Sequence, residues 1–149
     1  MTSLGARPNK VHQVSLGVMQ PYLFPYVGYF QLIHAVDCFV IYDDVNYIKQ
    51  GWVNRNRILL NGEPHLFTLP VKNASSFSPI NTVELDGKNV IAWSGKFLKT
   101  IGQAYARAPF LPAVLDLLHD VLTSPHADLA KLLEAGICAV SGYIGIRTP

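Results

Sequence analysis

Residues 14–42, VSLGVMQPYLFPYVGYFQLIHAVDCFVIY, are the stretch that decides the fold. Residues 14–19 form an apolar run of strand length, which stops at Pro21 because proline cannot donate a hydrogen bond to a central sheet ladder. From Gly28 the apolar residues recur at helical spacing, and residues 38–42 form a second buried-strand pattern. A strand, a loop, a helix and a strand in this order predict a βαβ unit with a right-handed crossover.

The loop of residues 20–26, which joins the first strand to the helix, should be stiff and shaped. Pro21 and Pro25 each fix a backbone angle, and Pro25 also restricts the residue before it, so we expect Phe24 to be extended. Ligands of such units bind outside the carboxyl ends of the strands. We therefore expect this loop to lie beside residues 43–46 on one rim of the sheet.

The polar segment of residues 47–58, YIKQGWVNRNRI, follows this rim and combines cations, amides and two large aromatic residues. That density is unusual because only 15% of the chain is charged. Planar guanidinium groups suit phosphate and carboxylate, so the segment predicts a site for an anionic small molecule. The alternative is a polar loop with aromatic anchors packed beneath it. The residues that we expect to line the site are Gln20, Tyr22, Tyr26, Gly28, Asn46, Lys49, Trp52, Asn54, Arg55, Asn56 and Arg57.

Asp43 and Asp44 follow the second strand and are the candidates for catalysis. Because neighbouring strand residues point to opposite faces, one of them could face the pocket as a general base, a metal ligand or a ribose-binding group. The alternative is an aspartate that caps a helix or a turn. The sequence shows no histidine or cysteine spacing typical of a metal site and no motif for a nucleophilic acyl-enzyme. We therefore expect no metal and name no cofactor.

Residues 19–33, 42–46 and 51–58 resemble the WbqC-like protein family. Members of this family are often encoded with bacterial O-antigen and other surface-polysaccharide genes. The resemblance implies a group transferase that acts on a nucleotide-linked or carrier-linked intermediate, with a nucleotide sugar or an acyl donor as its anionic substrate. Family members are generally longer, so we expect this chain to lack part of the family's C-terminal half. The alternative is a non-catalytic protein that binds an anionic ligand or acts as a scaffold.

The proline-bounded turn that enters the helix at Gly28 is similar in placement to the phosphate-facing turn of HIGH-type nucleotidylyltransferases. In those enzymes the free amides of the helix N-terminus receive the phosphates. Tyr26 and Tyr29 stand where their histidines would be expected, so the likeness concerns the fold and not the reaction.

The composition predicts one soluble domain over residues 14–149, after a flexible tail of residues 1–13. A net charge of +2 is too small to indicate nucleic-acid binding. We find no signal peptide and no apolar run long enough for a membrane span, so we expect a cytoplasmic protein. Cys38 and Cys138 fit core thiols. Association into a homo-oligomer is left open.

The remaining chain predicts a β-hairpin and then helices. Asn61-Gly62 lies between residues 58–60 and 66–71, and this dipeptide is the strongest short hairpin signal. Residues 80–85 alternate as a strand, and helices are expected over 90–106, 112–123 and 128–144, the last interrupted or ended near Gly136. The predicted fold is α/β, with a Rossmann-like βαβ core, a mixed sheet, an inserted β-hairpin region and C-terminal helices.

Overall fold

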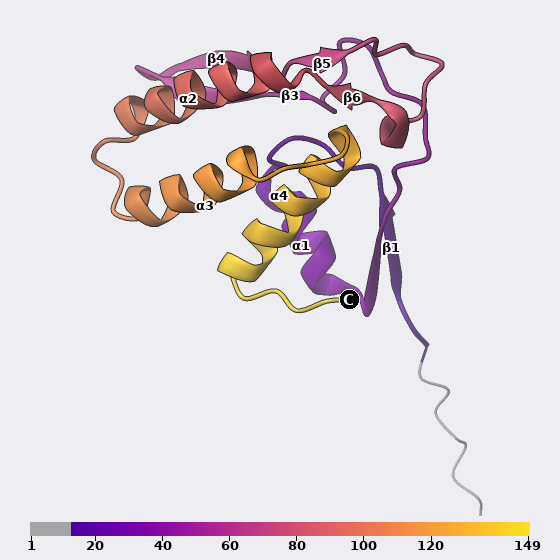
Figure 1. The fold of residues 1–149 in the computed structure, drawn as a ribbon. Helices are drawn as coiled ribbons and strands as arrows, with labels where there is room; N and C mark the ends of the chain where they lie inside the picture. Colours follow the sequence, from indigo (N-terminus) through magenta and orange to yellow (C-terminus); the bar gives the residue numbers. More distant parts are fainter. Residues whose placement is uncertain (1–12) are drawn as a thin grey trace, which may run out of the picture.

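The computed structural model describes residues 13–149, which form a mixed α/β structure with four α-helices and short strands. In chain order the elements are β1 (Leu16–Met19), α1 (Val27–Ala35), β2 (Cys38–Ile41), β3 (Arg55–Leu60), β4 (Glu63–Thr68), β5 (Val71–Lys72), the 3-10 helix η1 (Ile80–Thr82), β6 (Glu84–Leu85), α2 (Gly87–Ala104), α3 (Leu111–Thr123) and α4 (Leu129–Tyr143). Figure 1 shows β3, β4 and α2 at one end of the molecule, β1 and α1 at the other, and α4 between them. The flexible tail predicted for residues 1–13 lies outside the described residues, except for Gln13.

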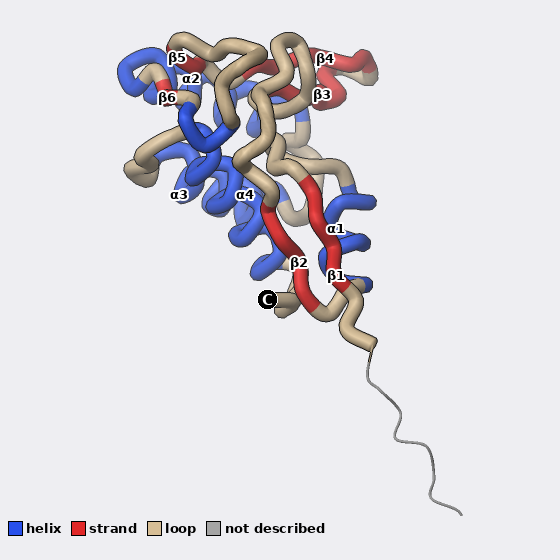
Figure 2. The backbone as a smooth tube through the Cα atoms, turned by 90° about the vertical axis from the view of Figure 1, so that its right-hand side faces the viewer, coloured by secondary structure: helices blue, strands red, loops and turns tan. Residues whose placement is uncertain are grey.

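The predicted βαβ unit is confirmed. β1 and β2 pair in parallel, from Leu16 opposite Cys38 to Met19 opposite Ile41. Helices α1 and α4 lie behind this pair in Figure 2, so one face of the pair is covered. The other face leaves Leu16 and Val18 exposed.

The expected mixed sheet does not form. Within residues 13–149 the strands make three separate two-stranded sheets, one parallel and two antiparallel. After β2 the chain pairs with residues 78–81 instead of returning to the sheet. The amide of Tyr47 donates to the carbonyl of Ser78 over 2.8 Å, and Ile80 donates to Val45 over 2.9 Å. A single parallel pair does not establish a Rossmann-like core.

The predicted hairpin is confirmed, with β3 and β4 antiparallel around Asn61 and Gly62. Both turn residues have positive φ, 54° and 84°, as a type I′ turn requires. However, β3 begins at Arg55, three residues earlier than expected, so four of its six residues come from the polar segment.

The strand expected over residues 80–85 forms only in its last part. Residues 80–82 form η1, and Glu84–Leu85 form the strand β6. The hydroxyl of Thr82 donates to the carbonyl of Pro79 over 2.8 Å, which closes this turn.

The three C-terminal helices are confirmed, but the predicted interruption near Gly136 is wrong because α4 runs through it. Gly136 is buried, and a Cβ there would lie 3.7 Å from both the Phe24 ring and Val121. The glycine therefore marks a close contact between α4 and its neighbours and not a helix end.

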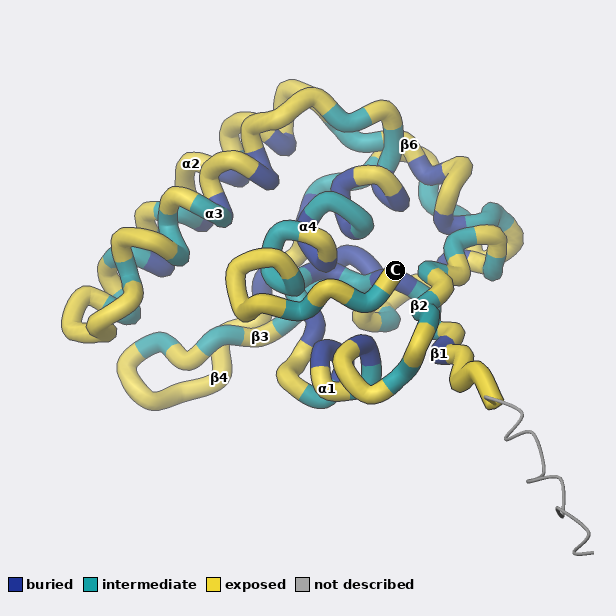
Figure 3. The backbone as a smooth tube through the Cα atoms, turned by 90° about the horizontal axis from the view of Figure 1, so that it is seen from below, coloured by how far each residue is buried: buried dark blue, intermediate teal, exposed yellow. Residues whose placement is uncertain are grey.

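The main hydrophobic core lies between the hairpin and helices α2, α3 and α4, and Figure 3 shows the buried residues of these helices turned inward. A smaller cluster of Tyr29, Phe30, Ile33 and Ile137 joins α1 to α4. Within residues 13–149, no helix combines the length and the apolar character that crossing a membrane requires.

Candidate functional site

The carboxyl ends of β1 and β2 lie side by side, as the βαβ pattern predicted. The amide of Tyr42 donates to the carbonyl of Met19 over 2.8 Å, one step beyond the last strand pair. Gln20 and Asp43 therefore leave the same end of the sheet.

The loop of residues 20–26 is fixed by the segment that precedes and begins β3. The amide of Leu23 donates to the carbonyl of Val53 over 2.9 Å. The side-chain amide of Asn56 donates to the carbonyls of both Leu23 and Phe24, over 3.0 and 2.8 Å. The loop and the polar segment are thus brought together, and Asn56 acts as the clamp between them.

The extended conformation predicted for Phe24 is wrong. Its φ is 47°, a left-handed value that is costly for an aromatic residue. The Phe24 ring lies nearly parallel to the Phe97 ring of α2, with 6.1 Å between the ring centroids and 4° between the planes. Pro25 by itself favours an extended Phe24, which would avoid this strain. The ring stacking and the hydrogen bonds from Asn56 stabilise the left-handed conformation instead and offset its cost.

Asn54, Arg55 and Asn56, three of the predicted binding residues, make side-chain hydrogen bonds to other parts of the protein. Asn54 is only 6% exposed; its oxygen accepts from the Tyr47 hydroxyl over 2.7 Å, and its nitrogen donates to the Leu69 carbonyl over 2.8 Å. The Nε of Arg55 donates to the Gly51 carbonyl over 2.8 Å. We assign Asn54 and Asn56 structural roles, because their amide nitrogens already have buried or part-buried partners.

Tyrosine rings cover the start of α1. A Cβ on Gly28 would lie 2.3 Å from a ring carbon of Tyr26, so this ring packs where a side chain would otherwise be. Tyr22 and Tyr29 meet edge to face with centroids 5.3 Å apart, and burial raises the pKa of both phenols. The Tyr29 hydroxyl donates to the Gln20 carbonyl over 3.4 Å. The helix start is therefore an aromatic surface more than an open cradle for phosphate.

Asp43, one of the two candidate acids, lies near η1 and the start of α4. The carbonyl of Asp43 accepts from the Asn81 amide over 3.1 Å, and its carboxylate lies 3.5 Å from the Asn81 side chain. The pKa of Lys131 is raised chiefly by its hydrogen bond to Glu134, with a small contribution from Asp43. Asp44, Asn46 and Lys49 are exposed.

A cavity of about 380 Å³ lies between the hairpin and helices α2, α3 and α4. Most of its wall is hydrocarbon, and its polar residues are Asn56, Arg57 and Tyr143. The guanidinium carbon of Arg57 lies 5.1 Å from the centre of the Trp52 ring, a cation–π contact. Arg57 and Trp52 are both exposed, Trp52 by 48%. The arrangement places one cation, supported by an indole, beside an apolar hollow.

Most residues that line this cavity were not expected to belong to a site. They are Phe24, Ile58, Phe67, Phe97, Ile101, Val114, Leu117, Leu118, Val140, Tyr143 and Ile144. Their helical or strand spacing indicates core residues, and the sequence carries no signal that the core between these elements is incompletely filled.

No metal centre is visible in the structure's described part, since no three histidine, cysteine or acidic side chains cluster there. His34 lines a second hollow, of about 250 Å³, with Ile144 and Ile146. His65 lines another beside β4 and α2.

The fold and this site define a mixed α/β protein with a proline-bounded loop clamped beside a cationic, aromatic edge. The chain belongs to the WbqC-like protein family, whose model matches residues 20–149. It is similar to the uncharacterized protein Rv1507c of Mycobacterium tuberculosis, with 32% identity over 135 residues. That match covers 89% of this chain and 57% of the relative, so the chain spans less than two thirds of the relative's length. No solved structure matches the chain.

Proposed function

We propose that this protein is a cytoplasmic group transferase that acts on a nucleotide- or carrier-activated intermediate of bacterial surface-polysaccharide biosynthesis. Membership of the WbqC-like family supports this pathway, because its members are often encoded together with surface-polysaccharide genes. The observation that carries the proposal is Arg57, held on the Trp52 ring at the edge of the 380 Å³ cavity. Arg57 would bind the phosphate or carboxylate of the activated group.

The guanidinium of Arg57 is available for such a ligand. Among residues 13–149, no carboxylate comes within the 4.0 Å of an ion pair with it. The Trp52 ring positions the guanidinium, and the planar donor fork suits two oxygens of one phosphate or carboxylate.

Other residues of the predicted rim would complete the site. Lys49 would add a second cation, and Trp52 could stack on a base or a sugar. Gln20, Tyr22 and Tyr26 would line the loop side. Asp43 or Asp44 would serve as base or orienting group at the carboxyl end of β2.

We also interpret β1, α1 and β2 as part of a Rossmann-like core. Parallel strands occur almost only in sheets whose two faces are both covered. The exposed Leu16, Val18 and Val40 on the open face of the pair fit a sheet that is covered on that side as well.

The test is a thermal-shift screen of the purified protein against nucleotide sugars, nucleoside triphosphates, coenzyme A and acyl donors. A ligand at 100 times its dissociation constant stabilises the native state by ~2.7 kcal/mol. Arg57→Gln should abolish the shift, whereas Arg107→Gln, a change of another exposed arginine, should leave it intact. A shift that survives Arg57→Gln would refute the assignment of Arg57.

One observation favours the second reading, a binding protein without turnover. The residues that line the 380 Å³ cavity include no carboxylate, so a catalytic acid or base would have to act from the rim outside it. The double change Asp43→Asn and Asp44→Asn separates the two readings. A transferase loses turnover with little change in ligand affinity, whereas a binder shows no turnover in either form.

A further inference from the structure

We infer that the anionic ligand at Arg57 is the phosphate of a lipid, and that its aliphatic chain lies in the apolar hollow beneath the hairpin. This inference rests on the proposed function, because it takes Arg57 as the anion-binding residue, and it names the class of carrier. The substrate would be a long-chain lipid monophosphate or a group activated on one.

The wall of the hollow is suited to hydrocarbon. It is built from the rings of Phe24, Phe67 and Phe97 and from aliphatic residues of α3 and α4. The hollow opens to solvent beside exposed Arg57, Tyr143 and Ile144, and covering its apolar wall removes hydrocarbon surface from water, which favours an apolar ligand. A volume of about 380 Å³ is well above that of a water molecule, so this space fits an apolar ligand.

Two neighbouring hollows share wall residues with this one, which favours a long ligand. Ile101, Val114 and Leu118 also line a neighbouring hollow of about 260 Å³ that reaches Pro109 and Phe110. At the other end, Ile144 also lines the hollow of about 250 Å³ between α1 and the C-terminal segment.

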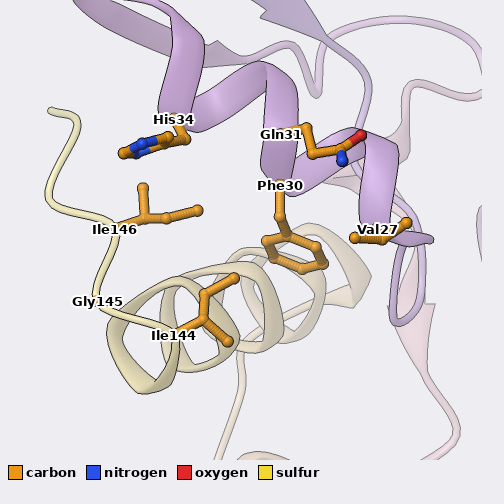
Figure 4. Close-up of a pocket in the computed structure, with 7 residues that line it drawn as sticks. All are labelled: Val27, Phe30, Gln31, His34, Ile144, Gly145 and Ile146. Atoms are coloured by element: carbon orange, nitrogen blue, oxygen red, sulfur yellow. The ribbon is translucent and has the colours of Figure 1, made fainter.

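Figure 4 shows this second end, where the Phe30 ring points from α1 toward Ile144 and His34 lies above Ile146. The middle hollow shares wall residues with each of the other two, so we treat the three as a row lined mainly by hydrocarbon. A flexible chain fits such a row better than a compact sugar or base does.

The charge of the residues that line the hollows indicates which head group the aliphatic chain of the ligand carries. Across the three hollows, Arg57 is the one permanently charged residue that lines a wall. It lies at the edge of the middle hollow, close to the exposed Trp52. One cation beside a long apolar row matches a lipid with one anionic head, and the guanidinium fork matches phosphate oxygens.

The experiment measures separately how much the phosphate head group and the aliphatic chain contribute to binding. Binding of dodecyl phosphate, butyl phosphate, inorganic phosphate and dodecanol is measured by isothermal titration below the micelle concentration. We expect dodecyl phosphate to bind at least ten-fold more tightly than butyl phosphate and than dodecanol. Equal binding of dodecyl and butyl phosphate would overturn the lipid inference while leaving the anion site in place.

Two variants and a control assign the parts. Arg57→Gln should weaken both alkyl phosphates, and failure of that result alone would refute the proposed anion site. Ile144→Glu, at a half-exposed position on the wall, should weaken dodecyl phosphate at least ten-fold and leave butyl phosphate unchanged. Phe77→Glu, a control at an 89% exposed loop residue, should change neither.

A second copy of the chain is the competing occupant. If light scattering shows a dimer that Ile144→Glu dissociates, with no binding of dodecyl phosphate to either form, the row of hollows is a protein interface and the lipid inference is wrong. A monomer that binds dodecyl phosphate with one-to-one stoichiometry supports it.

Discussion

Asn56→Ala should destabilise the protein in the absence of any ligand, because Asn56 clamps the loop that carries the predicted site. The substitution removes two hydrogen bonds, of 3.0 Å to the Leu23 carbonyl and 2.8 Å to the Phe24 carbonyl. Leu23 is 1% exposed, so its carbonyl has little access to water as a replacement partner. With about 1 kcal/mol for each bond and a penalty for the carbonyl left without a partner, we expect a loss of ~2–3 kcal/mol.

The assay is urea unfolding followed by circular dichroism. At a slope of about 2 kcal/mol per molar urea, the expected loss lowers the unfolding midpoint by roughly 1 M. Hydrogen exchange provides a local measure, because the Leu23 amide, bonded to Val53, should exchange faster once the clamp is gone.

Asn46→Ala is the matched control. Asn46 is an exposed asparagine of the same rim, and its substitution should change the free energy of unfolding by less than about 0.5 kcal/mol. If Asn56→Ala costs no more than this control, the clamp does not hold the loop. The role of Asn56 would then return to ligand binding, as the sequence pattern suggested.

Two further predictions concern α4 and the aromatic cluster. Gly136→Ala should stabilise the protein by about 0.5–1 kcal/mol, because the added Cβ meets Phe24 and Val121 at an ordinary 3.7 Å and alanine is the better helix former. A lower urea midpoint for this variant would mean that α4 packs more closely on Phe24 than described. The second prediction concerns pH. Burial, followed by the charge of Tyr22, raises the pKa of Tyr29 in the folded protein, so the tyrosine ionises first in the unfolded chain. The free energy of unfolding should therefore fall as the pH rises past about 10. Tyr29→Phe should flatten this dependence in urea titrations between about pH 9 and 11, and an unchanged slope would show that Tyr29 is not its source.

The roles of the individual polar residues could not be predicted from the sequence. The segment of residues 47–58 looks like a row of ligand-binding groups, yet the amides of Asn54 and Asn56 bind backbone carbonyls. These partners are 15 and 33 residues away along the chain. No local pattern identifies them, because the fold alone brings them within hydrogen-bond distance.

The sequence by itself determined the elements whose signals are local. Apolar runs of strand length and helical spacing specified the βαβ unit and the three later helices, and Asn61-Gly62 specified the hairpin turn, because these patterns depend on the backbone preferences of neighbouring residues. The motifs of residues 19–33, 42–46 and 51–58 also determined the family.

Only the tertiary structure decided the rest. It set the left-handed conformation of Phe24 and carried α4 through Gly136. It also left the hollow beside Arg57 between four separate elements. The physical reason is common to all three: each depends on how surfaces distant in the sequence pack together, and packing can override a local preference or leave a space that no local preference records.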